Sequence, residues 1–251
     1  MIRVAVPAIT VACGLLAIAW IVRAANSNAL WRIVHDCEST QARLGRPGKC
    51  ERVNLAAHYA VLKDLRGRTH FLLLPTARIT GIESPALLAP DALNFWQDAW
   101  EARGFVAERA GTSVPRDMIG LSINSPHARS QNQLHIHIDC VAPALRQALN
   151  QSQAGIGEQW SSSPMRLAGH DYFVLKLHGQ DLTGEDPFRL LMVRLSHPAT
   201  QMADHVLSVI GAQFDDGSPG FYILDSPVGA FGATTEAVLD RSCQLLTGGH
   251  S

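Results

Sequence analysis

The chain has 251 residues, which is long enough for one large domain or two small ones. Lysine and arginine number 21 against 22 for aspartate and glutamate, so the formal net charge is −1. This balance argues against a protein that coats nucleic acid, because such proteins carry a basic excess. Hydrophobic residues make up 47% and charged residues 17%, a composition that excludes intrinsic disorder. The 11 histidines are the unusual feature of the composition.

A run of 19 uncharged residues extends from Val4 to Val22, between Arg3 and Arg23. At about 1.5 Å per residue, a helix of this length nearly matches the hydrocarbon core of a bilayer, roughly 30 Å. We therefore expect residues 1–27 to form an uncleaved membrane anchor, with the rest of the chain exported. A cleaved signal peptide, whose apolar region is about 7–15 residues long, is one alternative, and a buried helix of a soluble domain is another.

The exported part holds an even number of cysteines: Cys37, Cys50, Cys140 and Cys243. An oxidising compartment would pair them, and four cysteines allow three pairings. Cys37 with Cys50 would close a short loop that contains glycine and proline. Cys140 with Cys243 would tie the middle of the chain to its end. Four separate buried thiols are the alternative.

The first part of the exported chain combines helices with apolar strands. We expect helices over residues 28–44 and 92–103 and a short one from Pro143, strands over 57–65, 69–75, 118–124 and 133–141, and a linker over 155–164. Arg66-Gly67 makes a hairpin turn between the first two strands. Pro90-Asp91 begins the second helix, and Gly104 ends it.

A similar order of elements follows the linker. We expect strands near residues 172–177, 189–195 and 221–225 and a helix over 198–210. His70 precedes Asn124 by 54 residues, and His170 precedes Asp225 by 55. This spacing predicts an internal duplication into a catalytic half, residues 28–154, and a degenerate half, residues 155–251, that lacks a histidine pair.

The most informative segment is residues 122–140, SINSPHARSQNQLHIHIDC. On a strand, alternate side chains share one face. Three apolar side chains therefore point into a core: Leu134, Ile136 and Ile138. Four polar side chains share the opposite face: Gln133, His135, His137 and Asp139. Two neighbouring imidazoles on one face indicate a functional site rather than a lone core histidine.

The histidine pair suits two kinds of chemistry. It can supply two metal ligands, with a third from Asp139 or His70. Alternatively, one imidazole is a nucleophile and its neighbour tunes it, while backbone amides of the preceding loop hold an anion. That loop is small and polar, carries Arg129, and has Ser130 five residues before His135. Its composition favours the nucleophilic interpretation.

The same segment resembles the active-site strand of the histidine-triad (HIT-like) superfamily of nucleotidyl hydrolases and transferases. The superfamily pattern has an asparagine, a loop with a serine, and three residues at alternate strand positions, usually all histidine. Alignment on the serine gives these matches: Asn124, Ser130, Gln133, His135 and His137. Gln133 replaces the first histidine of the triad. Another register would use His135, His137 and Asp139 and would make His137 the nucleophile.

Upstream, the run THFLLLP resembles the hairpin strand of the superfamily, whose histidine, here His70, joins the cluster. Asp64 falls near the position of an acidic ribose contact. The resemblance implies an α+β fold in which helices pack on an antiparallel sheet. It also implies two HIT-like halves in one chain, after the transmembrane helix, that mimic the usual dimer.

Within this superfamily, the anchor and the runs QNQLHIHI and AVLKDLRGRTHFLLLP resemble the bacterial CDP-diacylglycerol pyrophosphatase family. This resemblance implies hydrolysis of CDP-diacylglycerol to CMP and phosphatidate through a covalent cytidylyl group on His135. His137 and His70 would polarise the phosphate oxygens. Substrate would be bound by Asn124, Ser130, Gln133, Arg129 and Asp64.

The resemblance further implies no cofactor or metal, no nucleic-acid partner and no obligate protein partner. It places the chain in the bacterial inner membrane by a single span, with the catalytic domain on the periplasmic side. Three alternatives differ in function. They are a metal-dependent phosphohydrolase that uses His135 and His137, a HIT-type hydrolase of soluble nucleotide conjugates, and a non-catalytic nucleotide sensor.

Overall fold

The computed structural model describes residues 27–247. The expected membrane span, Val4–Val22, lies outside these residues. Between residues 27 and 247, none of the helices combines the length and the apolar character that a membrane crossing requires.

Antiparallel strands form a ten-stranded sheet in the described part of the chain, in the order β1-β2-β3-β5-β4-β8-β9-β7-β6, with β10 paired to β5. The strands are β1 (Arg52–Asn54), β2 (Tyr59–Lys63), β3 (Phe71–Pro75), β4 (Ile119–Ile123), β5 (Ile136–Val141), β6 (Met165–Leu167), β7 (His170–His178), β8 (His205–Gln213), β9 (Pro219–Pro227) and β10 (Leu239–Asp240). Helices pack on this sheet, so the expected α+β class is confirmed.

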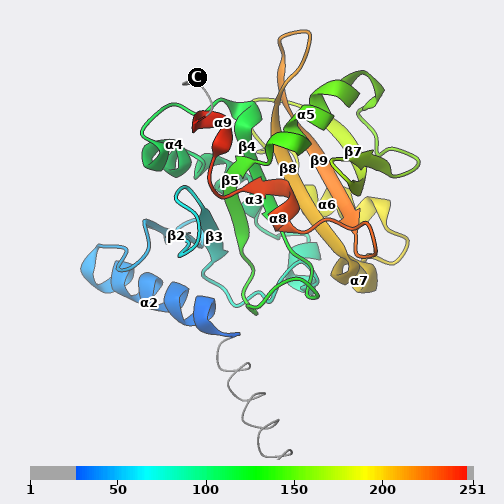
Figure 1. The fold of residues 1–251 in the computed structure, drawn as a ribbon. Coiled ribbons are helices and arrows are strands. Elements are labelled where there is room, and N and C mark those ends of the chain that lie inside the picture. The colour runs from blue at the N-terminus through cyan, green and yellow to red at the C-terminus, as the bar shows by residue number, and fades with distance from the viewer. Residues whose placement is uncertain (1–26, 248–251) are drawn as a thin grey trace, which may run out of the picture.

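The α-helices are α2 (Ala29–Leu44), α3 (Phe95–Glu101), α4 (Gly104–Ala110), α5 (Pro143–Ser152), α6 (Pro187–Arg194), α7 (Pro198–Gln201), α8 (Thr235–Val238) and α9 (Gln244–Thr247). Short 3-10 turns cover Pro85–Leu88, Arg116–Met118, Gln153–Gly155 and Met202–Asp204. Figure 1 shows α2 at the β2–β3 end of the sheet and α5 and α8 across β8 and β9.

Apolar side chains cover the two faces of the sheet differently. On one face, a large core joins α3 and α6 to the strands, with Trp96, Trp100 and Phe188 fully buried. On the other face, one cluster packs α2 against β2 and β3. A separate cluster packs α5 and α8 against β7, β8 and β9. The part of this face over β5 lies between the two clusters.

The strand order repeats along the chain. In the first part, the hairpin β2–β3 is followed by α3 and α4 and then by β4 and β5, in the spatial order β2-β3-β5-β4. In the second part, the hairpin β6–β7 is followed by α6 and α7 and then by β8 and β9, in the spatial order β6-β7-β9-β8. The two sets meet where β4 pairs with β8. His70 directly precedes β3, and His170 begins β7.

Three expected elements differ in the structure. Residues 189–195 were expected as a strand, but residues 189–194 lie in α6 and Leu195 is its C-cap. This helix begins at Pro187 after the N-cap Asp186, whose carboxylate accepts from the Phe188 amide. The expected helix over 198–210 is wrong beyond Asp204, because β8 starts at His205 and pairs with both β4 and β9. Gly104 begins α4 instead of ending a helix.

Two disulfides join the four cysteines as Cys37–Cys50 and Cys140–Cys243. Of the three pairings that the sequence allowed, the structure has this one. The first ties α2 to the β1–β2 edge, with the two Cα atoms 5.9 Å apart. The second ties the end of the chain to β5 across a sequence separation of 103 residues. The four separate thiols are therefore excluded.

Candidate active site

A pocket of about 710 Å³ opens on the sheet face over β5. Its size is typical of small-molecule sites. Both imidazoles of the sequence pair, His135 and His137, line it. Cations outnumber anions in its wall: Lys49, Lys63, Arg66, Arg129 and Arg241 against Asp64 and Glu236. This imbalance favours an anionic ligand. An apolar wall faces the same space: Ala29, Leu30, Ile33, Leu62 and Leu72.

The alternation expected for the histidine strand is confirmed. Leu134, Ile136 and Ile138 belong to the large core on one side of the sheet. His135 and His137 lie on the opposite side and line the pocket. Because β5 pairs with β3 on one side and β4 on the other, the backbone that carries His137 is fixed, and His135 directly precedes this paired stretch.

His135 has one ring nitrogen engaged and the other available. Its Nδ1 lies 2.6 Å from the carbonyl oxygen of Gln133. A carbonyl only accepts hydrogen bonds, so the proton of the neutral ring must be on Nδ1. Nε2 therefore carries the lone pair of the ring. No group in residues 27–247 forms a hydrogen bond with it. This is the arrangement that a nucleophilic imidazole needs.

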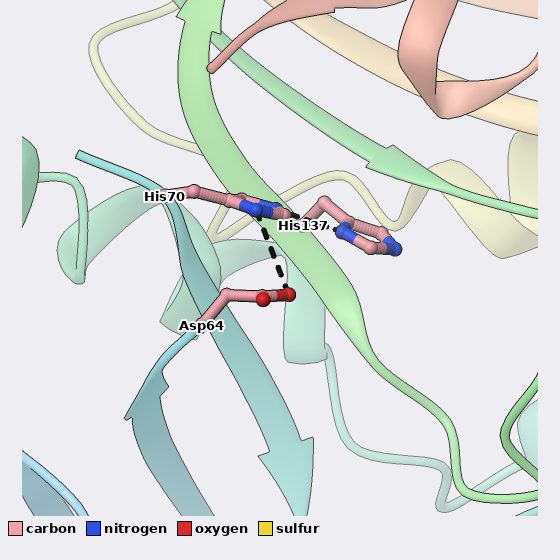
Figure 2. Close-up of side chains that lie close together, drawn as sticks. All are labelled: Asp64, His70 and His137. Carbon is pink, nitrogen blue, oxygen red and sulfur yellow. Dashed lines mark hydrogen bonds and ion pairs between the residues drawn. The ribbon is translucent and has the colours of Figure 1, made fainter. Parts of the chain in front are cut away.

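Beside His135, the buried ring of His70 lies between two residues that line the pocket, His137 and Asp64. Figure 2 shows Asp64, His70 and His137 in this arrangement. His70 Nε2 and His137 Nδ1 share a hydrogen bond of 2.8 Å. His70 Nδ1 faces Asp64 Oδ2 at 3.6 Å, longer than a hydrogen bond. The ring of His137 meets the ring of His135 edge-on, with centroids 4.9 Å apart.

Burial keeps these imidazoles neutral. It lowers the pKa of His70 to about 4. It also lowers the pKa of His135, more than the Gln133 carbonyl raises it. The pKa of His137 falls well below the usual value, first because of burial and then because of His135, His70 and the Arg241 cation. A neutral imidazole near pH 7 has a free lone pair, so it is suited to act as a nucleophile or as a hydrogen-bonding neighbour of one. It is less suited to act as a general acid, which must carry a proton to donate.

The loop before β5 supplies the other residues expected from sequence. Ser130 and Asn124 line the pocket. The Oδ1 of Asn124 accepts from the Thr235 amide at 2.9 Å, which leaves its NH₂ group to donate. Arg129 also lines the pocket, but its guanidinium is bound by both carboxylate oxygens of Glu83, each at 2.6 Å.

Gln133 is placed differently from its expected role. Its side chain is fully buried, does not line the pocket, and donates to the carbonyls of Pro75 and Ala77, each at 2.9 Å. The amide therefore ties the end of β3 to the start of β5, and the contact of Gln133 with the site is its carbonyl on His135. Asp139 also does not line the pocket, and its Oδ1 accepts from the Thr69 hydroxyl at 2.7 Å.

Two groups of potential metal ligands occur in the described part of the chain. Asp64, His70 and His137 place their ligand atoms within 4.8 Å of one another. In this group, however, the two imidazole nitrogens form a hydrogen bond with each other. Asp139, Cys140 and Cys243 form the second group, but both sulfurs are in a disulfide. In the first group, a metal would therefore have to separate the two hydrogen-bonded nitrogens of His70 and His137.

Several pocket residues were missed by the sequence reasoning. Glu236 and Arg241 come from the C-terminal segment, and Leu30 and Ile33 come from α2. None belongs to a motif. The only sequence signal for Arg241 was its closeness to Cys243 together with a Cys140–Cys243 pairing, which would bring it to β5.

Comparison with known proteins matches residues 25–247 to the family model described as CDP-diacylglycerol pyrophosphatase. A Yersinia pestis protein named CDP-diacylglycerol pyrophosphatase is 37% identical over 228 residues, covering 89% of this chain and 87% of that protein. The chain belongs to the CDP-diacylglycerol pyrophosphatase family. The resemblance to this family that the sequence indicated is thus confirmed. The matched region, residues 25–247, contains every residue that lines the pocket.

The protonation of the three clustered histidines, of which His135 and His137 line the pocket, can be measured without any substrate. Because burial penalises the imidazolium, we expect His70, His135 and His137 to titrate below the ordinary value of 6.5, with His70 near 4. NMR of histidine-labelled protein between pH 8 and 4, assigned with single His→Gln variants, shows how far below 6.5 each ring remains neutral. A midpoint at or above 6.5 for any of the three would contradict this electrostatic account.

Proposed function

We propose that the chain hydrolyses the diphosphate bond of CDP-diacylglycerol and produces CMP and phosphatidate. The observation that carries this proposal is the fixed tautomer of His135, which presents Nε2 to a cation-lined pocket. Family membership supports the choice of substrate. The mixed pocket wall also supports it, because the basic side suits a diphosphate and the side formed by Leu30, Ile33 and Leu62 suits the apolar end of a lipid.

The proposed reaction has two steps. In the first, Nε2 of His135 attacks the phosphorus on the cytidine side, and a P–N bond forms. The P–O bond to phosphatidate breaks, and its electron pair leaves on the phosphatidate oxygen. In the second step, a water oxygen attacks the same phosphorus and loses a proton. The P–N bond breaks, its electron pair returns to Nε2, and CMP leaves.

The neighbouring residues have separate proposed tasks. The carbonyl of Gln133 keeps the proton on Nδ1 and stabilises the positive charge that His135 acquires on attack. Ser130 and the free NH₂ of Asn124 would donate to phosphate oxygens. His137 would hold His135 in place, and the diphosphate charges would favour protonation along the His137–His70 pair.

We also propose that the two parts of the chain are duplicated HIT-like halves. The repeated strand order supports this, as does the place of His170 at the start of β7, which matches that of His70 before β3. The counterpart of β5 is β9, whose sequence PGFYILDSP has no histidine. On this proposal the chemistry belongs to the first half alone.

A substrate panel tests the function. We expect the detergent-solubilised full chain to release CMP from CDP-diacylglycerol, and to do so equally with and without EDTA. Dinucleoside polyphosphates should be poor substrates, because they lack the apolar part that the pocket wall accommodates. Preference for the dinucleotides would favour the soluble-nucleotide alternative, and loss of activity in EDTA would favour the metal-dependent one.

Substitution and trapping test the nucleophile. His135→Ala removes the attacking nitrogen, so activity should fall on the order of 10³-fold or more. His137→Ala leaves the nucleophile but removes a neighbour, and a loss of about 10²-fold is expected. His170→Ala is the matched control, because this histidine of the second half lies outside the pocket, and its ring contacts the Gly232 carbonyl at 3.2 Å and the Tyr172 ring at 6.5 Å between centroids. It should retain about a tenth of the activity or more.

Substrate labelled on the cytidine-side phosphorus should leave an acid-labile, base-stable label on His135, as a phosphoramidate does. Label on His137 would favour the other register of the triad. A loss in His170→Ala as large as that in His135→Ala would refute the assignment of the chemistry to the first half.

For location, we propose a single-span anchor in the bacterial inner membrane and a periplasmic catalytic domain. The uncharged run Val4–Val22, the two disulfides and a lipid-linked substrate support this. Protease added to spheroplasts should digest residues 24–251 of the membrane-bound protein, whereas a cytoplasmic marker survives. Full protection of the domain in intact spheroplasts, with digestion after lysis, would reverse the orientation.

A further inference from the structure

The C-terminal segment returns from the second half of the chain to the catalytic strand. Strand β10 pairs with β5 at Leu239↔Val141 and Asp240↔Cys140, directly beyond the stretch where β3 pairs with β5. The Cys140–Cys243 disulfide then attaches the segment to β5 a second time. Arg241 lies between these two attachments.

The backbone of Arg241 is also held by the turn that leads to His70. Its carbonyl accepts from the Arg68 amide at 3.3 Å. Gly67 packs against it so closely that a Cβ there would lie 2.9 Å from the Arg241 Cβ. Arg241 is therefore fixed to the same turn that positions Asp64 and His70.

The side chain of Arg241 extends into the pocket wall. It is 26% exposed, and its Nη2 bonds Glu236 Oε1 at 2.8 Å. Glu236 is 55% exposed, so this ion pair is weak and easily exchanged for another anion. The charge of Arg241 reaches the catalytic cluster, since it lowers the pKa of both His70 and His137.

Two of the other pocket cations are less available. The side chain of Arg129 is only 7% exposed, and its guanidinium donates to both carboxylate oxygens of Glu83. Lys63 donates to the carbonyls of Asp64 and Gly67 at 2.6 and 2.7 Å. Arg241 combines a fixed backbone with a guanidinium whose carboxylate partner, Glu236, is half-exposed. A guanidinium can donate two parallel hydrogen bonds to phosphate oxygens.

We propose that Arg241 binds the diphosphate of the substrate and that the Cys140–Cys243 disulfide holds it in position, so that the second half of the chain completes the site of the first. The diphosphate would replace Glu236 as the ion-pair partner of the Arg241 guanidinium. This inference rests on the proposed function, because it takes the ligand to be a diphosphate.

Steady-state kinetics of four full-chain variants on CDP-diacylglycerol tests the arginine. Arg241→Gln should raise KM about tenfold or more with a smaller effect on kcat, because it removes a charge-assisted bidentate contact. Arg241→Lys should recover part of the loss. Glu236→Gln frees the guanidinium and should lower KM by about twofold. Arg68→Gln is the matched control on the adjoining turn, since Arg68 is exposed and outside the pocket, and it should leave KM unchanged.

A KM for Arg241→Gln less than threefold above that of Arg68→Gln would overturn the proposal. So would a KM for Glu236→Gln higher than that of the parent. If the parent chain itself releases no CMP, the proposed function fails instead, and the two failures are thus distinguishable.

A double perturbation tests the disulfide. Cys140→Ala/Cys243→Ala should raise KM in the parent but add no further increase in Arg241→Gln, because the disulfide acts through that side chain. Should the double-alanine variant not fold, reduction with dithiothreitol in the Cys37→Ala/Cys50→Ala background replaces it, and reoxidation should restore KM. Equal, additive losses in both backgrounds would show that the disulfide acts on the fold alone and would overturn its positioning role.

Discussion

The hydrogen bond between His135 Nδ1 and the carbonyl of Gln133 determines what the site can do. It fixes the tautomer, and with it the one nitrogen that faces the pocket. The bond depends on the backbone at the start of β5, which the buried Gln133 amide ties to the end of β3. The Gln133 side chain does not reach the pocket, but it positions the backbone carbonyl that sets the tautomer of His135.

The pocket exists because apolar packing on that face of the sheet stops on both sides of β5. The α2 cluster covers β2 and β3, and the α5–α8 cluster covers β7 to β9. Polar side chains occupy the interval between them, and the same apolar borders desolvate the imidazoles and lower the pKa of each. The neutrality of the histidines is therefore a consequence of how the sheet is covered. The carboxylate nearest to His70, that of Asp64, is partly exposed and 3.6 Å away, and burial outweighs its effect on the pKa of His70.

The sequence was sufficient to predict the parts of the site that local periodicity encodes. The alternation around His135 located the two faces of β5, and the resemblance of the run THFLLLP to the superfamily hairpin strand placed His70 in the cluster. Periodicity could not distinguish α6 from a strand, because residues 189–195 are a short apolar stretch whose helical start lies in the Asp186-Pro187 cap just upstream. It also could not show that the Gln133 amide bonds backbone carbonyls, because that partner choice depends on the end of β3.

Arg241 shows a different limit. Its neighbours in sequence carry no motif, and it reaches the pocket only through β10 and a disulfide between residues 103 positions apart. In a dimer of separate subunits, such a segment would have to cross an interface to reach the other site. In a single chain, the covalent connection supplies this segment at fixed stoichiometry, and on the proposed duplication the half without a histidine pair would then contribute to the pocket wall. On the proposed duplication, a second histidine pair would be redundant, because one pocket holds one substrate.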